Sequence, residues 1–402
     1  MNWKMSEVLD KAIYAVSHGQ SAFCRYITGN DTGTTGSHQS GFYIPKCASS
    51  LLFDKPAVRG ENMDKTVKIK WQDDFETESR FIYYGKGSRN EYRVTRFGRE
   101  FRYLKDENVG DLLILVKNDE EDYSGYVLSS DEDIDGFLAY FNLSSEDTNQ
   151  LINAEAIVNP NDKLAELLRA FIAKHQDFPT TVEMATAARD CYNEAFGTTK
   201  ESIYKNSDDV LLDWVKTEFD LFKAMEDKVY TPMLKTPFES VNQFVEAANQ
   251  LLNRRKSRAG KSLEHHLASI FTASDLIFEE QVVTEDNKKP DFIFPNGKCY
   301  KNFEFPAELL IALGAKTTCK DRWRQVISEA DRIEEKHLFT LQQGISKNQL
   351  REMHDAKVTL VVPHKYISSF PKEYQSSLLD LHTFVEFVKE KQANTPKYYL
   401  VS

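Results

Sequence analysis

The chain has 402 residues, enough for two domains that each bury a core of their own. Its 41% hydrophobic and 28% charged residues are typical of a globular protein, and no apolar run approaches the roughly 20 residues of a membrane-spanning helix, so we expect a cytoplasmic protein. The net charge of −11 excludes a surface coated with basic residues, although it leaves room for local basic patches.

The first part of the chain is predicted to be mainly β. Short stretches rich in β-branched and aromatic residues alternate with Gly-, Asn- and Asp-rich turns, which is the pattern of a barrel or a sandwich. These stretches are residues 41–44, 67–71, 80–84 and 112–116. We therefore predict a first domain over residues 1–152, followed by a linker over residues 153–162.

From residue 163 the pattern turns helical and then alternates between helices and strands. Apolar residues recur at i, i+3, i+4 and i+7 from Leu164, and again from Leu211. Further on we expect a helix that begins near Lys261, and a helix over residues 321–335. Strands are expected over residues 277–283, 309–318, 337–341 and 358–362. This order predicts an α/β domain over residues 163–402, with a mixed central sheet flanked by helices.

Positive charge is gathered in two clusters despite the acidic total. One comprises Arg89, Arg93, Arg96, Arg99 and Arg102, and the other comprises Arg254, Arg255, Lys256, Arg258 and Lys261. Compact basic patches on an acidic body are typical of a sequence-specific DNA-binding protein. The end of the second cluster, Gly260-Lys261-Ser262, is similar to the end of a phosphate-binding P-loop. The leading glycine of that motif would fall at Arg255, so we do not expect a nucleotide site.

Three residues in the second domain have the chemistry for phosphodiester hydrolysis, which needs a metal and a cation near the phosphate. Asp291 follows Pro290 at the start of one predicted strand, Lys316 ends the next, and Glu329 lies beyond it. Carboxylate oxygens are the ligands that Mg²⁺ prefers. Lys316 follows an apolar strand, where an unpaired charge is costly to bury, and Asp291 is the obvious partner. The alternative is that all three are ordinary surface residues.

Longer segments of the second domain resemble the EcoRII-type restriction endonucleases, which are PD-(D/E)xK nucleases. The matching segments are Asn253 to Glu264, Asn287 to Phe292 and Lys316 to Gln325. The resemblance implies Asp291 and Glu329 as Mg²⁺ ligands, Lys316 as the charge that positions and activates water, and Glu264 as a supporting acid, although a solvated helix residue is an equal alternative for Glu264. The usual second acid would fall at Gly314, two residues before the lysine, and this branch moves it to the position of Glu329.

The same resemblance implies several DNA contacts in the second domain. Lys320, Asp321 and Arg322 would read CC/GG base pairs, since Lys and Arg match guanine O6 and N7 and an acid accepts from cytosine N4. The alternative is a helix start with Asp321 near its cap. The phosphate contacts would come from Arg254, Arg255, Arg258 and Lys261. Trp214 would stack on an extruded base or, as the alternative, belong to the core.

The first domain resembles the effector domain of the same family, a DNA-binding pseudobarrel like that of plant B-three transcription factors. Residues that match its contact loops are Arg25, His38, Tyr43, Arg89, Asn90, Glu91, Arg93 and Arg96. Arg, Asn and Glu on one loop suit base-edge reading, with further arginines on phosphates. The alternative is an ordinary exposed hairpin.

These observations predict a Mg²⁺-dependent type II restriction endonuclease that cuts double-stranded DNA at a short CC…GG site resembling 5′-CCWGG. We expect a homodimer, because two-fold symmetry suits a near-palindromic site. We also expect a companion cytosine methyltransferase that acts on the same site. The alternatives are a DNA-binding protein built on an inactive nuclease fold, and a nuclease directed at modified cytosines.

Overall fold

The computed structural model describes residues 6–34, 41–87, 89–98, 101–119, 121–141, 143–152 and 162–400. The chain forms two compact units. Unit 1 comprises Met1–Ala156 with Gln342–Glu352 and Ser368–Ser376, and unit 2 comprises the remaining Ile157–Leu341, Met353–Ile367 and Ser377–Ser402. Within the described ranges, no helix has both the length and the apolar character needed to cross a bilayer.

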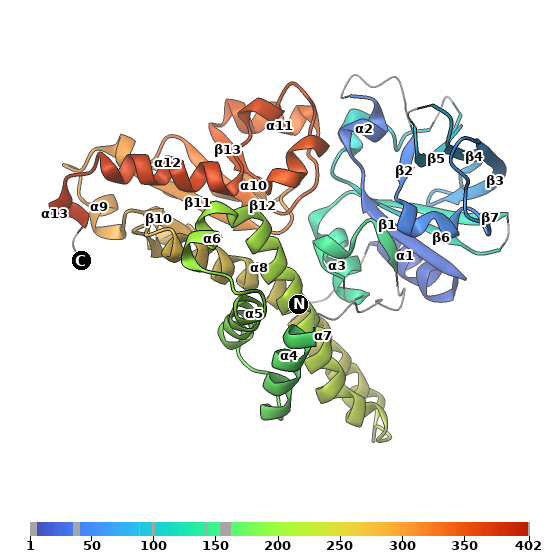
Figure 1. The fold of residues 1–402 in the computed structure, drawn as a ribbon, viewed down its shortest axis with the longest axis horizontal. Coiled ribbons are helices and arrows are strands. Elements are labelled where there is room, and N and C mark those ends of the chain that lie inside the picture. The colour runs from blue at the N-terminus through green and yellow to red at the C-terminus, as the bar shows by residue number, and fades with distance from the viewer. Residues whose placement is uncertain are drawn as a thin grey trace. The chain divides into compact units, whose positions relative to one another are not determined.

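Unit 1 is built on an eight-stranded sheet in the order β2-β5-β4-β3-β7-β6-β1-β8 (Figure 1). Its strands are β1 (Ser21–Tyr26), β2 (Phe42–Ile44), β3 (Met63–Trp71), β4 (Glu76–Tyr84), β5 (Glu91–Thr95), β6 (Leu112–Lys117), β7 (Asp122–Leu128) and β8 (Gln150–Ile152). Only β3 and β7 pair in parallel, and the other neighbours are antiparallel. The prediction of a mainly β first domain is confirmed, while closure into a pseudobarrel stays a prediction.

At β6 both faces of this sheet are covered, and the sequence of that strand shows why. All six of its residues are buried, with Leu113 and Leu115 facing an aromatic cluster around Trp71. Ile114 and Val116 face the opposite way, toward two helices, α1 (Glu7–His18) and α3 (Asp131–Tyr140). A continuous apolar run is what a strand covered on both sides requires. A further short helix, α2, spans Gly29–Thr32.

Unit 2 begins with a group of helices: α4 (Asp162–Lys174), α5 (Thr181–Phe196), α6 (Lys200–Lys205), α7 (Ser207–Leu234) and α8 (Val241–Ala273). The predicted helical stretches from Leu164 and Leu211 lie in α4 and α7. The ends of α5 follow from local chemistry, because Thr180 and Glu183 form a capping box and Gly197 adopts the left-handed conformation after the last turn. Most of the predicted linker, residues 153–161, lies outside the described residues.

The start of one predicted helix was wrong. The helix expected from Lys261 begins at Val241 and runs unbroken for 33 residues. The basic segment before Lys261 consists of good helix formers, and a single Gly260 costs only about 1 kcal/mol inside a helix. The basic cluster is therefore part of α8 rather than the loop before it.

The sheet of unit 2 has five strands in the order β13-β12-β11-β10-β9. They are β9 (Glu279–Glu280), β10 (Phe292–Phe294), β11 (Ile311–Lys316), β12 (Lys336–Thr340) and β13 (Val358–Val361). Strands β11, β12 and β13 are parallel, and β10 is antiparallel to both of its neighbours. The predicted mixed sheet flanked by helices is therefore confirmed.

Helices pack on both faces of this sheet. On one face, Phe271 of α8 contacts Phe292 and Phe294 of β10 and Phe384 of α12 (Leu381–Ala393). On the other face, Ile293 packs in a cluster with residues of α9 (Gly297–Lys301). The remaining helices are α10 (Trp323–Ile327), α11 (Lys347–Asp355) and α13 (Lys397–Leu400).

Two further element boundaries differ from the predictions. The strand expected over residues 277–283 is reduced to β9, because Gln281 adopts a positive φ of 53° that ends the extended run. The helix expected over residues 321–335 is reduced to α10, and Ala330 then takes a positive φ of 55°. Arg332 donates to the carbonyl oxygen of Cys299 at 3.0 Å, which ties the segment after α10 to α9 instead of continuing the helix.

Candidate active site

Asp291 lies directly before β10 and is held by β11. In the antiparallel register Phe292 pairs with Leu313, so Asp291 faces the carboxyl end of β11. One carboxylate oxygen, Oδ2, accepts from the backbone N–H of Ala315 at 2.7 Å and from Lys316 Nζ at 2.9 Å. The side chain is 8% exposed. The two strands therefore fix this carboxylate in one orientation.

Lys316 is the last residue of β11 and leaves the interior where the strand ends. The five residues before it are buried, whereas the Lys316 side chain is 20% exposed. Its ammonium group is thus paired with Asp291 and still reaches the surface. This is the Asp–Lys pairing that the sequence predicted.

Glu329 enters the same group from the turn after α10. It follows that helix by two residues, and its backbone N–H donates to Val326 at 3.2 Å. The position of Gly314 explains why an acid two residues before the lysine is missing. A Cβ atom at Gly314 would lie 2.8 Å from a methyl group of Val326, so α10 fills the space that a side chain there would need. The carboxylate instead comes from the end of α10.

Glu264 of α8 completes the group, together with a residue that the sequence did not reveal. Gln281 Nε2 donates to Asp291 Oδ1 at 3.1 Å and lies 3.4 Å from Glu264 Oε2. Its left-handed backbone conformation is uncommon for a residue other than glycine, and such strain is often found at functional sites. Nothing in the sequence distinguished Gln281 from a solvent-facing residue of a strand.

The electrostatics of the site favour the neutral forms of its two glutamates. The pKa of Glu264 is raised to about 7, chiefly by burial and then by Asp291, while Lys316 opposes the shift. The pKa of Glu329 is likewise raised to about 7, chiefly by burial, with Lys316 opposing the shift and Asp291 adding to it. Both glutamates thus interact with the same Asp–Lys pair.

The donor set fits a hard divalent cation. Oxygen Oε2 of Glu329 is buried and has no hydrogen-bond partner within the described structure. Mg²⁺ is usually held by one or two carboxylates, with water and substrate oxygens completing the octahedron. Among the described residues, no group of three or more His, Cys, Asp or Glu side chains is arranged to hold a metal ion. A metal ion here would therefore be held by two carboxylates, Asp291 and Glu329, and otherwise by water and substrate oxygens.

The predicted base-reading residues follow directly on this site. Lys320, Asp321 and Arg322 occupy the connection between β11 and α10. Asp321 is exposed, Arg322 is half-buried and donates to Thr318 Oγ1, and Lys320 is buried. The structure therefore places all three beside Lys316, with different degrees of access.

The basic segment of α8 divides into packed and exposed residues. Arg258 is buried with its guanidinium 4.5 Å from the ring centre of Phe219, and Arg255 donates to Glu226 Oε2 at 2.8 Å. Arg254 stacks on the ring of Phe178 at 4.3 Å. Lys261 is exposed. Packing within unit 2 therefore engages Arg254, Arg255 and Arg258.

Trp214 lies in the helical core, which is the alternative considered for it. The side chain is 1% exposed, and its Nε1 donates to Asn193 Oδ1 at 3.0 Å. Arg189 lies over its ring at 6.0 Å. In this structure the ring is covered and offers no free face to a base.

The candidate residues of unit 1 form a connected polar group along β1, β2 and β5. Arg25 donates to Asp31 Oδ1 at 3.0 Å and to the carbonyl oxygen of Tyr43 at 2.6 Å. Tyr43 pairs with Arg93 across the two strands. Arg93 forms an ion pair with Glu91 at 3.4 Å. The structure thus brings together four of the predicted residues.

The other candidates in unit 1 lie around β5. Arg89 precedes it, is exposed, and lies over the ring of Tyr84 at 5.2 Å. Asn90 accepts from the Tyr83 hydroxyl at 2.9 Å. Arg96 follows the strand, is exposed, and has a positive φ of 64°. His38 lies outside the described residues.

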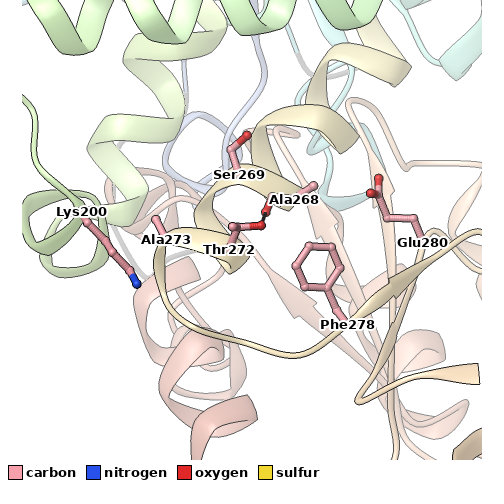
Figure 2. A pocket seen from close by; sticks show the side chains of 7 residues that line it. All are labelled: Lys200, Ala268, Ser269, Thr272, Ala273, Phe278 and Glu280. Carbon is pink, nitrogen blue, oxygen red and sulfur yellow. Dashed lines mark hydrogen bonds between the residues drawn. The ribbon is translucent and has the colours of Figure 1, made fainter. Parts of the chain in front are cut away.

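A separate pocket between α6, α8 and β9 does not have the chemistry of a catalytic site. Figure 2 shows the side chains that line it, which include Lys200, Ser269, Thr272 and Glu280. Lys200 forms an ion pair with Asp275. Both hydroxyls donate to backbone carbonyls of their own helix. Glu280 is the only acid in its lining, so Asp291 remains the centre of the candidate site.

Comparison with known proteins identifies the class of protein to which this fold belongs. The family model described as EcoRII C terminal matches residues 222–385. The model described as restriction endonuclease EcoRII, N-terminal, matches residues 16–146. These two matches define the class of the protein as a restriction endonuclease.

The family follows from one full-length relative. The type II restriction enzyme EcoRII of Escherichia coli is 36% identical over 408 residues, which cover 93% of this chain and 95% of that enzyme. The chain therefore belongs to the EcoRII family of type II restriction endonucleases.

Solved structures of restriction endonucleases are also similar, at lower identity. Metal-depleted Ecl18kI in complex with uncleaved DNA is 18% identical and has a TM-score of 0.45, and the match covers 60% of this chain and 87% of the Ecl18kI chain. The complex of restriction endonuclease PspGI with substrate DNA is 16% identical and has a TM-score of 0.44, and the match covers 54% of this chain and 95% of the PspGI chain. Structural similarity at TM-scores of 0.45 and 0.44 does not identify individual site residues.

Proposed function

We propose that this protein is a Mg²⁺-dependent type II restriction endonuclease that cuts both strands of DNA at a short CC…GG site of the 5′-CCWGG kind. The observation that carries the proposal is the Asp291–Lys316 ion pair of 2.9 Å, with Glu329 in the same electrostatic environment. Membership of the EcoRII family supports the same activity.

In the proposed reaction, Asp291 and Glu329 would hold the metal ion. When bound, Mg²⁺ supplies positive charge at the scissile phosphate and makes water more acidic. The N–H of Ala315 keeps Asp291 Oδ2 in place, so that the carboxylate does not have to reorganise during the reaction. Lys316 Nζ lies beside that oxygen, where it orients the attacking water and offsets charge on the phosphate. Glu264 acts as a supporting acid, and Gln281 bridges Glu264 and Asp291 by donating to both carboxylates.

The connection after β11 is proposed to read the CC/GG pairs. Lys320 and Arg322 would donate to guanine, and Asp321 would accept from cytosine. Their position next to Lys316 supports this, because base reading and cleavage then share one rigid segment. Of the basic residues on α8, the exposed Lys261 is best placed for a phosphate, whereas Arg254, Arg255 and Arg258 would also have to keep their contacts within unit 2.

Unit 1 is proposed to bind a second copy of the site as an effector. The exposed side chains of Arg89 and Arg96 support this, whereas Arg25 and Arg93 are buried and would also have to keep their contacts within unit 1. We further propose a homodimer on the near-palindromic site and a companion cytosine methyltransferase that protects host DNA.

Digestion of a sequenced plasmid tests the proposal. With Mg²⁺ we expect discrete double-strand cuts whose mapped ends lie at CC…GG sites, and with EDTA we expect none. Binding without cleavage would favour a DNA-binding protein on an inactive nuclease fold. Cleavage only of the cytosine-methylated plasmid would favour a nuclease directed at modified cytosines. Cuts without a common sequence would contradict the proposed site.

A further inference from the structure

The turn that carries Glu329 is tied to α9 by one side chain, Arg332. Its guanidinium donates to the backbone carbonyl oxygens of Cys299, at 3.0 Å, and Tyr300, which both lie in α9. It also donates to the carbonyl oxygen of Phe305, beyond that helix. An arginine side chain carries its N–H donors in a planar fork, so one residue can satisfy acceptors from several parts of a loop. Arg332 thus fastens the segment after Glu329 to a separate element.

Helix α9 is a firm support, because it packs on the strand that Asp291 enters. The two residues of α9 that accept from Arg332 are buried, and they share a hydrophobic cluster with Ile293 of β10. Carbonyl oxygens in the last turn of a helix lack helical partners, and a cation beside them is favourable. The contacts therefore lead from Asp291 through β10 and α9 to Arg332 and the turn of Glu329.

The local sequence does not stabilise this turn. Ala330, directly after Glu329, has a positive φ of 55°, which is unfavourable for a residue with a side chain. Oxygen Oε2 of Glu329 is buried and has no hydrogen-bond partner within the described structure. Oδ2 of Asp291, by contrast, accepts from the N–H of Ala315 and from Lys316. Asp291 is therefore oriented by its own hydrogen bonds, whereas Glu329 depends on contacts of the backbone that follows it.

Two further contacts reach the same segment. The backbone N–H of Asp331 donates to Glu285 at 3.2 Å, and Lys336 Nζ donates to the carbonyl oxygen of Ile333 at 2.8 Å. Each is a single hydrogen bond, whereas the guanidinium of Arg332 forms three. Among these contacts, Arg332 is therefore the one whose loss frees the turn most.

We propose that Arg332 is a positioning residue, which fixes the carboxylate of Glu329 at the metal site by holding its turn against α9. The proposal rests on the proposed function, in which Asp291 and Glu329 share a Mg²⁺ ion. Mg²⁺ demands near-ideal octahedral geometry, so a displaced carboxylate lowers its affinity. Groups that orient ligands without touching the metal typically contribute about 10- to 100-fold to metal affinity.

Two substitutions in the full chain test this role. Arg332→Met keeps the length of the side chain and removes its donors, and Arg332→Lys keeps the charge but cannot span three carbonyl oxygens. In single-turnover cleavage of a CC…GG duplex, Arg332→Met should raise the half-saturating Mg²⁺ concentration by about 10- to 100-fold. Most of the rate should return at saturating Mg²⁺, and the band shift without metal should be unchanged. Arg332→Lys should give a smaller shift, which decides the question if Arg332→Met does not fold; a wild-type Mg²⁺ dependence in Arg332→Lys would contradict the proposal.

Metal binding can also be measured without DNA. A ligand that binds only the folded state raises the unfolding temperature, so a series of Mg²⁺ concentrations reports the affinity. The concentration that gives a set rise should be higher for Arg332→Met by the same factor as in cleavage. A loss of stability alone would lower every unfolding temperature without shifting that concentration.

The matched control is Asp208→Ala. The Asp208 carboxylate accepts from the backbone N–H groups of His364, Leu381 and His382, three partners before and at the start of α12. This change therefore removes as many backbone contacts from unit 2 as Arg332→Met does. It should lower the unfolding temperature and leave the Mg²⁺ dependence unchanged. An equal shift for Asp208→Ala would mean that general loosening of the unit is the cause, and would overturn the proposal.

The remaining outcomes separate the role of Arg332 from the proposed function. Cleavage by the wild type, with an unchanged Mg²⁺ dependence in Arg332→Met, would overturn the role of Arg332 and leave the function standing. A shift in cleavage without a shift in the unfolding series would overturn it too, because Mg²⁺ would then be bound normally. A wild type that is stabilised by Mg²⁺ but never cuts DNA would overturn the function, and a shift by Arg332→Met in the unfolding series would still support the positioning role.

Discussion

Unit 2 contains two groups of buried carboxylates whose pKa values shift in opposite directions. In the helical group, Glu218 Oε2 accepts from Ser262 Oγ at 2.6 Å and lies 2.7 Å from His266 Nε2. Burial raises the pKa of Glu218, but the hydrogen bonds from His266 and Ser262 and the charge of Arg258 outweigh it, so the pKa is lowered.

In the group around Asp291 the shift is reversed, because burial outweighs the nearby lysines and the pKa values of Glu264 and Glu329 are raised to about 7. The comparison suggests two uses of a buried acid. Where hydrogen-bond donors and a cation offset burial, as at Glu218, the carboxylate holds helices together, and where they do not, we propose that it would accept a metal ion.

The largest expected effect is on catalysis at the Asp291 group. Lys316→Ala and Glu329→Gln should each lower the single-turnover cleavage rate by at least about 10³-fold, because each removes a charge that acts in the transition state. Unfolding temperatures should change little. The matched controls are Lys301→Ala and Glu308→Gln, two exposed residues of the same unit, which should cleave normally. Normal cleavage by Lys316→Ala would place the site elsewhere.

A substitution in the Glu218 group should instead affect stability and leave catalysis unchanged. Glu218→Ala should lower the free energy of unfolding by about 3–5 kcal/mol, because it leaves the donors of α8 buried without their acceptor. Cleavage per folded molecule should be unchanged. Denaturant titration followed by circular dichroism measures the first quantity, and active-site-normalised digestion the second. A Glu218→Ala variant that unfolds at the same denaturant concentration as the wild type but does not cleave DNA would contradict the distinction between the two groups.

His337 provides a pH test of buried polar groups that serve stability. Burial lowers its pKa to about 4, although Glu335 and a backbone contact to Ala312 oppose the shift. Between about pH 6.5 and pH 4, His337 is therefore protonated in the unfolded state but not in the folded state. Stability is complete above about pH 6.5 and is lost as pH falls toward 4, by about 3 kcal/mol. Unfolding measured between pH 7 and 4 should show this slope, and His337→Leu should flatten it; an unchanged slope in the variant would contradict the assignment.

The smallest effect is expected at Gln281, which contacts two acids of the Asp291 group. Gln281→Ala should lower the cleavage rate about tenfold while DNA affinity stays the same, because a hydrogen bond to a charged group contributes about 1.5–3 kcal/mol and this one is partly solvated. Gln281→Glu should lose more, since it adds a like charge beside Asp291 and Glu264. Equal rates for Gln281→Ala and wild type would remove Gln281 from the site.

The sequence predicted those features that depend on pattern within a segment. A stretch rich in β-branched and aromatic residues located the second half of β3, and the apolar run before Lys316 located β11 and the partner of Asp291. Chemistry and resemblance then singled out Glu264 and Glu329. These two acids do share the electrostatic environment of the pair.

Features that depend on tertiary contacts could not be predicted. The short α10 reflects the tie between Arg332 and α9, and the contact of Gln281 requires a left-handed turn that no local signal announced. Arg258 and Trp214 illustrate a second difficulty, because a basic or aromatic residue on a helix has the same sequence signature whether it faces DNA or the core. Only packing distinguishes the two.

The central claim is that Asp291 holds a metal ion at the scissile phosphate. It is tested most directly by Asp291→Asn, a change that preserves the size of the side chain and removes its charge. Wild type and variant are compared on one labelled DNA fragment that carries a CC…GG site, with band shift and cleavage measured from the same preparation. The account predicts equal band shifts, with Mg²⁺-dependent cutting by the wild type alone. Normal cutting by Asp291→Asn would contradict it.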